Sequence, residues 1–314
     1  MRDQRYPGRL ELLFIDGGSQ DRTPEILARL AGEDPRVRVL GNLLRRTPHA
    51  LNIGLSAATG TVICRMDAHT RYPPDYVRIG VERLLRGDAV SVSGPQIAVG
   101  CGRWSRRVAL ALQSPLGVGG ARFRLGADQE FEVDTGFTGL WLRETLERHG
   151  GWDEHWHNDQ DHELAMRLSA AGGRHICVPA MAAEYIPRDS LPALARQYWR
   201  YGFFKVRTLR RHPSSMRPSH LLPPGLAATL IGAVAAPRGV RRVARIGLGV
   251  YCLALGRAAV ATCGRASRAD RAFLPLVLAT MHLAYGFGML AGSARAGVPA
   301  AAVAEAARRL AVRT

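Results

Sequence analysis

An apolar run that breaks into small and acidic residues is the first candidate for chemistry in this sequence. The stretch ELLFIDGGSQDRT ends a strand-like run in Asp16, Gly17 and a second glycine, followed by Ser19 and Asp21. Two glycines let the backbone turn sharply and approach a ligand closely. An Asp at the carboxyl end of a strand lies where open α/β sheets bind ligands. The stretch predicts a ligand-binding loop, or a plain turn with a helix cap at Ser19 or Asp21.

A second candidate follows the apolar letters TVICRM, where the chain continues as Asp67, Ala68 and His69. A carboxylate and an imidazole two residues apart at a strand end can both reach one divalent cation. Mg²⁺ prefers a few protein oxygens together with phosphates and water, and Mn²⁺ accepts the imidazole more readily. The alternative is a solvated turn before Tyr72.

A third candidate is the stretch NDQDHELAMRLSAAGG, residues 158–173, which places Asp159, Asp161 and Glu163 at the start of a predicted helix. Acidic residues in a first helical turn are favoured by the helix dipole, and that alone could explain them. A carboxylate that faces a pocket there could also act as a general base on a hydroxyl group.

Two further stretches could line a bound ligand. Residues 135–139 contain small side chains, which are typical of a floor under a ligand or of a packed turn. The letters QYWRYG contain Gln197, Trp199 and Arg200 just before a strongly apolar region. Aromatic residues with Arg at such a boundary indicate an interfacial anchor, or a surface that stacks on a sugar and binds a diphosphate.

The elements that must position these residues alternate between strand-like and helix-like patterns. Strands followed by helices predict a largely parallel sheet whose strand ends contact the ligand. The predicted strands cover residues 10–16, 37–42, 60–69 and 89–97, and the predicted helices cover 22–31, 49–58 and 73–86.

The formal net charge of +17 is confined to the C-terminal part of the chain. Residues 1–189 carry 24 basic and 24 acidic side chains, whereas residues 190–314 carry 19 basic and two acidic ones, Asp270 and Glu305. A nucleic-acid-binding protein would show its excess charge in the soluble half. Basic residues between apolar stretches favour an anionic membrane surface instead.

Three apolar runs in the basic region, 221–237, 246–264 and 272–292, are candidate membrane segments. A span needs about 20 mostly apolar residues; the third run meets this, and the second has Arg257 in its interior. Arg-bearing loops on all sides leave the topology open between three spans and an interfacial first segment followed by a hairpin.

The remaining bulk features indicate a reduced protein with its catalytic part in the cytoplasm. Five cysteines are scattered without zinc-like spacing, and they are predicted to be packing residues. The opening stretch MRDQRYPGRLE is polar and basic, unlike a signal peptide.

Taken in order, the motifs resemble those of family 2 inverting glycosyltransferases with the GT-A fold. The order is Asp-Gly-Gly-Ser-x-Asp, then Asp-x-His, then Gln-Asp, then Gln-x-x-Arg-Tyr before hydrophobic segments. The stretches SPLGVGGARFR and RMDAHTRYPPDYV are similar to the succinoglycan-type exopolysaccharide enzymes. The resemblance covers about residues 1–292 and implies an α/β, Rossmann-like GT-A fold, with C-terminal hydrophobic helices.

The resemblance implies a role for each candidate residue. Asp16 would contact the nucleotide, with Gly17, Ser19 and Asp21 supporting that loop. Gln197 and Arg200 would hold the donor or the product end of the glycan.

It also implies the metal site and the base. Asp67 and His69 would hold a divalent metal, Mn²⁺ or Mg²⁺, that bridges the diphosphate of the sugar nucleotide. Asp161 would deprotonate the acceptor hydroxyl as it attacks the anomeric carbon.

Three features depart from the family pattern. His69 stands where a second Asp is usual, and Gln160 replaces the usual Glu. Family members also have a further strand and helix, about thirty to forty residues, ahead of the Asp16 strand. A chain truncated there would have an exposed edge on that strand. The alternative to an enzyme is therefore an inactive, membrane-anchored binding or scaffold protein.

The sequence thus predicts a catalytic domain over 1–205 and a membrane-associated region over 206–314. The expected activity moves a hexose from a nucleotide sugar, UDP-linked by preference, to a lipid-linked saccharide in exopolysaccharide synthesis. The expected location is the plasma membrane with the catalytic domain in the cytoplasm, and no nucleic acid is expected as a partner.

Overall fold

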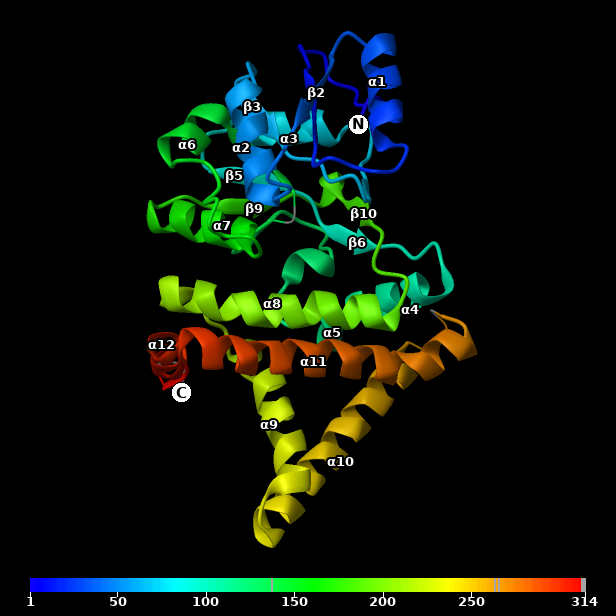
Figure 1. The fold of residues 1–314 in the computed structure, drawn as a ribbon, viewed down its shortest axis with the longest axis vertical. Helices are drawn as coiled ribbons and strands as arrows, with labels where there is room; N and C mark the ends of the chain where they lie inside the picture. The colour runs from blue at the N-terminus through cyan, green and yellow to red at the C-terminus, as the bar shows by residue number, and fades with distance from the viewer. Residues whose placement is uncertain (137, 263, 265, 312–314) are drawn as a thin grey trace. The chain divides into compact units, whose positions relative to one another are not determined.

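The chain forms two compact units, which are described separately (Figure 1). The computed structural model describes residues 1–136, 138–262, 264 and 266–311. The first unit comprises 1–96 and 126–183, and the second comprises 97–125 and 184–314. Helix α8 (Leu191–Arg211) continues through the predicted domain boundary at 205. The compact units therefore divide elsewhere, and the division into catalytic and membrane-associated parts stays a prediction.

The first unit alternates strands and helices in its N-terminal part, which confirms the predicted order of elements there. Its first elements are β1 (Leu12–Asp16), α1 (Thr23–Glu33), β2 (Val37–Gly41), α2 (Thr47–Ala57), β3 (Val62–Cys64), β4 (Thr70–Arg71), α3 (Tyr76–Leu84), β5 (Ser91–Ser93) and β6 (Gln96–Ala98). It continues with β7 (Phe131–Glu132), β8 (Gly139–Leu142), α6 (Arg143–Arg148), α7 (Gln160–Ala170), β9 (His175–Cys177), a 3₁₀ turn at Pro179–Met181 and β10 (Ala183–Tyr185). The unit boundary falls at β6 and β10.

The prediction of a largely parallel sheet is wrong, because the main sheet is mixed. Its five strands lie in the order β3-β8-β5-β9-β7. Only β5 and β9 are parallel within it, whereas β8 runs antiparallel to both β3 and β5. Strand β8 follows β3 and β5 in the sequence but lies between them in the sheet, so the sheet does not follow a simple strand-helix-strand order. A smaller sheet has the order β4-β10-β6.

Strand β1 pairs in parallel with β2 and with no other described strand. Its residue Asp16 is level with Gly41 at the carboxyl end of the pair. On its other side β1 has no strand partner among the residues that the structure describes. Glu11, next to that strand, accepts hydrogen bonds from the backbone of Thr59 and Gly60 at 2.6 and 2.8 Å, which ties the start of β1 to the segment before β3.

Two apolar clusters fix the helices of the first unit against its main sheet. In one, Tyr76 of α3 packs with Val92 of β5 and Leu140 of β8, all fully buried. In the other, Leu164 of α7 packs with the buried Trp152. This packing fixes the position of α7, and with it the position of the helix's first turn.

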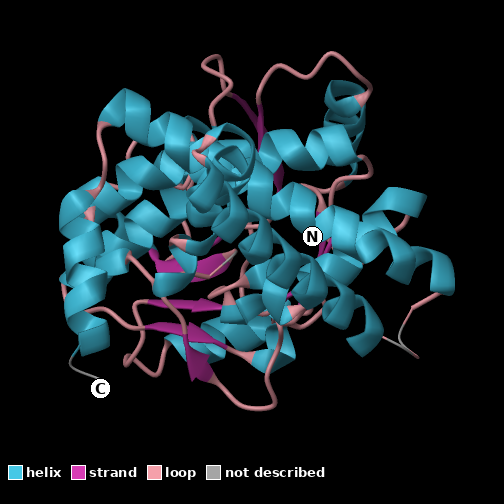
Figure 2. Cartoon of the chain, turned by 90° about the horizontal axis from the view of Figure 1, so that it is seen from below, coloured by secondary structure: helices cyan, strands magenta, loops and turns pink. Residues whose placement is uncertain are grey.

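The second unit is almost entirely helical, and Figure 2 shows that helices predominate in the chain as a whole. Its elements beside α8 are α4 (Arg103–Leu112), α5 (Pro115–Val118), three 3₁₀ turns (Arg122–Arg124, Pro213–Ser215 and Pro218–His220), α9 (Leu222–Ala235), α10 (Arg238–Ala261), α11 (Arg268–Ala296) and α12 (Ala300–Ala311).

Helices α8 and α11 lie side by side with their backbones in close contact. A Cβ atom at Gly202 of α8 would lie 2.0 Å from the carbonyl oxygen of Tyr285. A Cβ at Gly288 of α11 would lie 2.1 Å from that of Trp199. Only glycine fits such an approach, so these positions let the two helices pack at short range.

The three predicted membrane segments correspond to α9, α10 and α11, with shifted ends. By length and composition α10 and α11 could cross a membrane, with mean hydropathies of 1.5 and 1.6. The most apolar part of α10 is only 11% buried in the protein, and that of α11 is 39% buried. Helix α9, with 14 residues, pairs with α10 in a hairpin whose turn points away from α8 and α11 (Figure 1).

Four of the five cysteines are free thiols, which agrees with the predicted reduced state: Cys64, Cys101, Cys177 and Cys252. The predicted packing role is wrong for Cys101 and Cys252, because both are exposed. Cys263 lies outside the described residues.

Candidate active site

The guanidinium group of Arg65 brings together two acidic residues that lie far apart in the sequence. Arg65 Nε donates to Asp67 Oδ1 at 2.9 Å, and Nη2 donates to Asp67 Oδ2 at 3.2 Å. Its Nη1 donates to Asp161 Oδ1 of α7. The carboxylates of Asp67 and Asp161 are thus separated by no more than one guanidinium group.

These three side chains differ in their access to solvent. Arg65 has 9% of its side-chain surface exposed, Asp67 has 17% and Asp161 has 32%. Desolvation raises the pKa of Asp161, while the charge of Arg65 acts to lower it. The nearby charge of Asp67 also raises the pKa of Asp161. A carboxylate with a raised pKa is a better proton acceptor than an ordinary exposed one.

The structure separates Asp161 from the two other acids at the start of α7. Glu163 is buried and accepts hydrogen bonds from Arg167 at 2.8 and 2.9 Å, so it joins successive turns of the helix. Asp159 precedes the helix with a φ of 64°, a left-handed conformation that few non-glycine residues adopt. Of the three, Asp161 is the one bound by Arg65.

Asp67 and His69 lie in one short loop between β3 and β4, and His69 is exposed. The backbone N–H of Asp67 donates to the Tyr72 hydroxyl at 2.8 Å, which fixes the loop. Within the described ranges no group of three or more His, Cys, Asp or Glu side chains could hold a metal. One carboxylate and one imidazole still fit a Mn²⁺ or Mg²⁺ ion whose other ligands are phosphate oxygens and water, because Asp67 keeps unused lone pairs on both oxygens.

The Asp16 loop is a compact turn closed by its own carboxylate. Gly18 N–H donates to Asp16 Oδ2 at 3.0 Å, and the Ser19 hydroxyl donates to Oδ1 at 2.6 Å. These bonds, the one from the Ser19 hydroxyl first, lower the pKa of Asp16. Gly18 has a φ of 75°, which requires glycine, and Gly17 precedes it.

Asp21 serves the start of α1, because its carboxylate accepts the Thr23 N–H at 2.9 Å. The Thr23 side chain and this bond lower the pKa of Asp21. The predicted turn is present, but the predicted helix cap at Ser19 or Asp21 is wrong, because the N-cap residue of α1 is Arg22 and no side chain that the structure describes caps the helix. The turn leaves a ligand-binding role for the loop open.

Gln197 and Arg200 lie on α8, in the second unit, and are described there alone. Gln197 Nε2 donates to the Tyr201 hydroxyl at 2.8 Å and to the Tyr185 hydroxyl at 3.4 Å. Arg200 is exposed. The Gln197 amide is thus held in an aromatic surrounding.

The small residues near 135–139 form packing contacts where the structure describes them. Thr138 is buried, and its hydroxyl lies 3.2 Å from the Tyr76 hydroxyl. A Cβ at Gly136 would lie 2.5 Å from the Ser93 hydroxyl oxygen. These contacts favour the packed turn over a ligand floor; residue 137 lies outside the described residues.

Sequence reasoning missed two arginines at these sites. Arg65 is two residues before Asp67, so an extended backbone places both on one face, and this spacing could have revealed it. Arg45 has a φ of 54°, and a Cβ at Gly18 would lie 3.2 Å from its guanidinium nitrogen. Such a backbone conformation in a non-glycine residue is often found at functional sites, but nothing in the local sequence predicts it.

The chain is similar to known proteins in sequence and in fold. A family model described as "Glycosyl transferase family 2" matches residues 1–147. The chain is 34% identical over 267 residues to the succinoglycan biosynthesis protein ExoA of Rhizobium meliloti, covering 82% of this chain and 80% of that protein. It is 29% identical over 170 residues to a beta-monoglucosyldiacylglycerol synthase of Trichormus variabilis, covering 52% of this chain and 35% of the synthase.

A solved structure shows the same fold. The mannosyltransferase PcManGT from Pyrobaculum calidifontis, in complex with GDP-Man and Mn²⁺, has a TM-score of 0.54 and 22% identity. The match covers 93% of this chain and 80% of that one. With its GT-A fold and its similarity over most of its length to a curated relative, the chain belongs to glycosyltransferase family 2.

Proposed function

We propose that this glycosyltransferase moves a hexose from a nucleotide sugar to a lipid-linked saccharide, as a step in the synthesis of an exopolysaccharide. The observation that carries the proposal is the pairing of Asp67 and Asp161 on one guanidinium group. A metal-binding carboxylate and a base must lie within the length of one sugar diphosphate, and the positions of these two residues are compatible with that requirement.

In the proposed reaction Asp161 is the base. Its carboxylate takes the proton of the acceptor hydroxyl as the oxygen attacks the anomeric carbon from the face opposite the leaving nucleoside diphosphate. The new glycosidic bond forms as the bond to the phosphate oxygen breaks. The raised pKa of Asp161 supports the role, because a base works best when its pKa approaches the working pH.

Asp67 and His69 would hold a divalent metal in this scheme. When bound, such an ion neutralises the charge that develops on the leaving diphosphate. Two hydrogen bonds from Arg65 hold the Asp67 carboxylate in place. Complexes of Mn²⁺ with the related fold support the choice of metal.

The nucleotide-binding loop would consist of Asp16, Gly17, Ser19 and Asp21, and Asp16 would contact the nucleotide. The closed turn presents this loop in one conformation, which lowers the cost of ordering it on binding. Gln197 and Arg200 would hold the donor or the product end of the glycan. Arg45, beside Gly18, could add a charge toward a phosphate.

Membrane association belongs to the same proposal. We assign it to residues 206–314, and we place the enzyme at the plasma membrane with its catalytic part in the cytoplasm. Support comes from the apolar helices α10 and α11, which are long and apolar enough to cross a membrane. A scaffold without turnover is the alternative, and the acidic pair at Arg65 argues against it.

A donor-hydrolysis screen tests the proposal. UDP-, GDP- and dTDP-sugars are offered to the full chain with Mn²⁺, Mg²⁺ or a chelator, and the released nucleoside diphosphate is measured. We expect release from one donor class, UDP first, and only with metal. Equal release from the wild type and the Asp161→Asn variant would refute the assigned base, and no release from any donor would favour the scaffold.

A further inference from the structure

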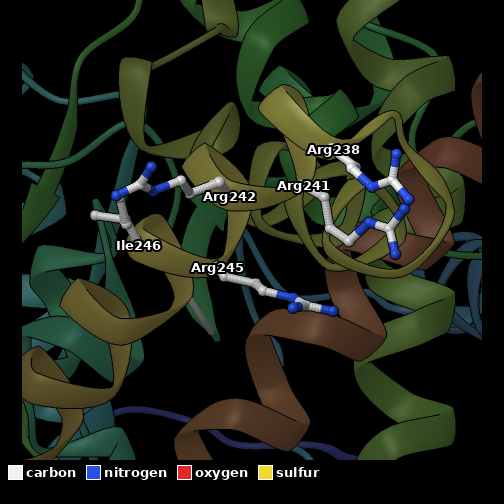
Figure 3. A pocket seen from close by; sticks show the side chains of 5 residues that line it. All are labelled: Arg238, Arg241, Arg242, Arg245 and Ile246. Atoms are coloured by element: carbon white, nitrogen blue, oxygen red, sulfur yellow. The ribbon is translucent and has the colours of Figure 1, made fainter.

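A pocket of about 430 Å³ opens beside the turn between α9 and α10. It lies within the first turns of α10. Five residues line it, of which four are arginines (Figure 3): Arg238, Arg241, Arg242, Arg245 and Ile246. The pocket belongs wholly to the second unit and has no part in the acidic pair described above.

Among the residues that the structure describes, no acidic side chain forms an ion pair with the arginines of this pocket. No Asp or Glu occurs between residues 190 and 269. In the part of the chain that the structure describes, Arg238 and Arg242 make no ion pair, and the Nε of Arg241 is buried without a partner. Arg245 donates only to the Ala233 carbonyl, at 3.3 Å. Like charges that line one pocket repel one another, so an anion from outside the chain would stabilise these guanidinium groups.

The arrangement of the guanidinium groups is suited to phosphate. Those of Arg238, Arg241 and Arg245 extend to one side of the turn, while Arg242 extends along Ile246 on another side (Figure 3). Arg binds phosphate oxygens through two parallel N–H bonds and is less strongly hydrated than Lys. Several such groups on successive helical turns can bind one phosphate or two neighbouring ones.

The surroundings of the pocket favour a lipid phosphate over a soluble one. The exposed apolar residues of α10 recur every three or four positions, which places them along one face of the helix. Val243 is 70% exposed and Leu253 is 71% exposed. The members of this apolar face are Val240, Val243, Ile246, Val250, Leu253 and Val260. A soluble phosphate would need no such face, whereas acyl chains beside a headgroup would cover it.

The length of α9 indicates how the hairpin lies. With 14 residues it is about 21 Å long, shorter than the hydrocarbon core of about 30 Å. That arm cannot carry the arginines across the bilayer. A hairpin in the boundary between headgroups and acyl chains satisfies both its charges and its apolar face.

We propose that the Arg238–Arg245 pocket binds the phosphate of an anionic phospholipid, with the α9–α10 hairpin lying in the membrane interface. This inference deepens the proposed membrane association and rests on it. It gives the basic segment, residues 190–314, a defined site for a lipid headgroup, beyond a general attraction of positive charge to the membrane.

The test compares two double variants of the full chain in detergent. Arg238→Gln with Arg241→Gln removes two charges from the pocket. Arg257→Gln with Arg268→Gln removes two exposed arginines from the same basic segment, outside the pocket. Binding of fluorescent phosphatidylglycerol in mixed micelles is measured by anisotropy, with labelled phosphatidylcholine as the neutral probe.

We expect the wild type to prefer phosphatidylglycerol, and the pocket variant to lose at least about tenfold in affinity, as two lost headgroup contacts require. The control variant should stay within about threefold. Equal losses in both variants would show diffuse electrostatics and overturn the site. Equal binding of both lipids by the wild type would overturn it as well. Displacement of the lipid by millimolar inorganic phosphate would assign the pocket to a soluble anion.

Failure of this inference is separable from failure of the proposed function. Donor hydrolysis in detergent should be the same for wild type and both double variants, because none of these arginines belongs to the catalytic machinery. If a high-salt wash extracted the wild type from membranes, the proposed association with the apolar part of the membrane would be refuted. If the protein stayed in the membrane pellet but the pocket variant kept its lipid affinity, only the proposed phosphate site would be refuted.

Discussion

The two units of this protein use the same residue, arginine, in opposite ways. The first unit carries 18 basic and 22 acidic side chains, and the second carries 25 basic and four acidic ones. In the first unit Arg83 pairs with Asp88 at 2.6 Å, and Arg65 pairs with Asp67 at 2.9 Å. In the described part of the second unit, the four arginines of the pocket beside the α9–α10 turn form no ion pair with a carboxylate.

This difference shows what the charge of each unit is for. Where acids and bases are balanced, an arginine organises carboxylates inside the protein, and the resulting fixed geometry suits chemistry. Where bases greatly outnumber acids, a few arginines still pair, such as Arg107 with Asp270, and we propose that the unpaired ones bind ligands outside the chain. A single value of +17 for the whole protein hides both uses.

The largest effect should come from the acid that the first unit sets in place. Asp161→Asn keeps the shape of the side chain and removes its basicity, so transfer should fall by about 10³-fold. Donor binding should be unchanged, as measured by calorimetry. Glu163→Gln is the control, since Glu163 bonds Arg167 within the helix. Transfer by Asp161→Asn at a rate near that of the wild type would mean that the paired carboxylates serve structure only.

The second effect concerns the other carboxylate of the pair. Asp67→Ala should weaken metal-supported nucleotide binding by about 100-fold, because a direct ligand contributes at least as much as the residues that orient it. Calorimetry with UDP and Mn²⁺ measures this, and a chelator should reduce the wild type to the level of the variant. Asp75→Ala, an exposed acid that pairs with Arg78, is the matched control. Unchanged metal-supported affinity in Asp67→Ala would contradict the assignment.

The third effect compares two arginines within the first unit. Arg65→Met leaves two adjacent carboxylates without a counter-charge, which should cost about 2 kcal/mol of stability. Arg83→Met removes a guanidinium of similar burial, but its partners Asp88 and Glu130 are more exposed, so the loss should stay below about 1 kcal/mol. Thermal unfolding of both variants shows which of them loses more stability. The reverse order would show that the Arg65 cluster is not the more strongly coupled one.

The smallest effect separates the interior of the second unit from its hairpin. Gly288→Ala places a methyl group against the Trp199 carbonyl and should destabilise the α8–α11 contact by about 1 to 2 kcal/mol. Gly249→Ala in α10 meets nothing within 4 Å and should stabilise slightly, since alanine favours helix. Melting in detergent measures both. If Gly288→Ala melted like the wild type, the two helices would not need their close approach.

Most local elements could be predicted from the sequence, and some contacts between them could not. Periodicity and turn residues located β1, α1, β2, α2 and α3 within a few residues. The same patterns gave a parallel sheet, because nothing in the letters GLWL of β8 indicates that it pairs between β3 and β5 in the opposite direction. Strand order depends on packing between distant segments, which local patterns do not report.

The candidate site shows the same limit. The sequence does not distinguish between the three acids at the start of α7, Asp159, Asp161 and Glu163. Only the packing of the folded chain shows that Arg65 binds Asp161. Arg65 and Asp161 are 96 positions apart. Likewise α10 and α11 have nearly equal hydropathy, and only their surroundings show that one is mostly exposed and the other packs on α8.

The sequence by itself determined the family resemblance, the order of the first strands and helices, and the confinement of excess charge to the C-terminal region. The tertiary structure decided which acids lie together, which apolar helix is covered by protein, and where unpaired arginines gather. The reason is physical. Propensity and periodicity act over a few neighbouring residues, whereas burial and charge pairing depend on segments that meet only when the chain has folded.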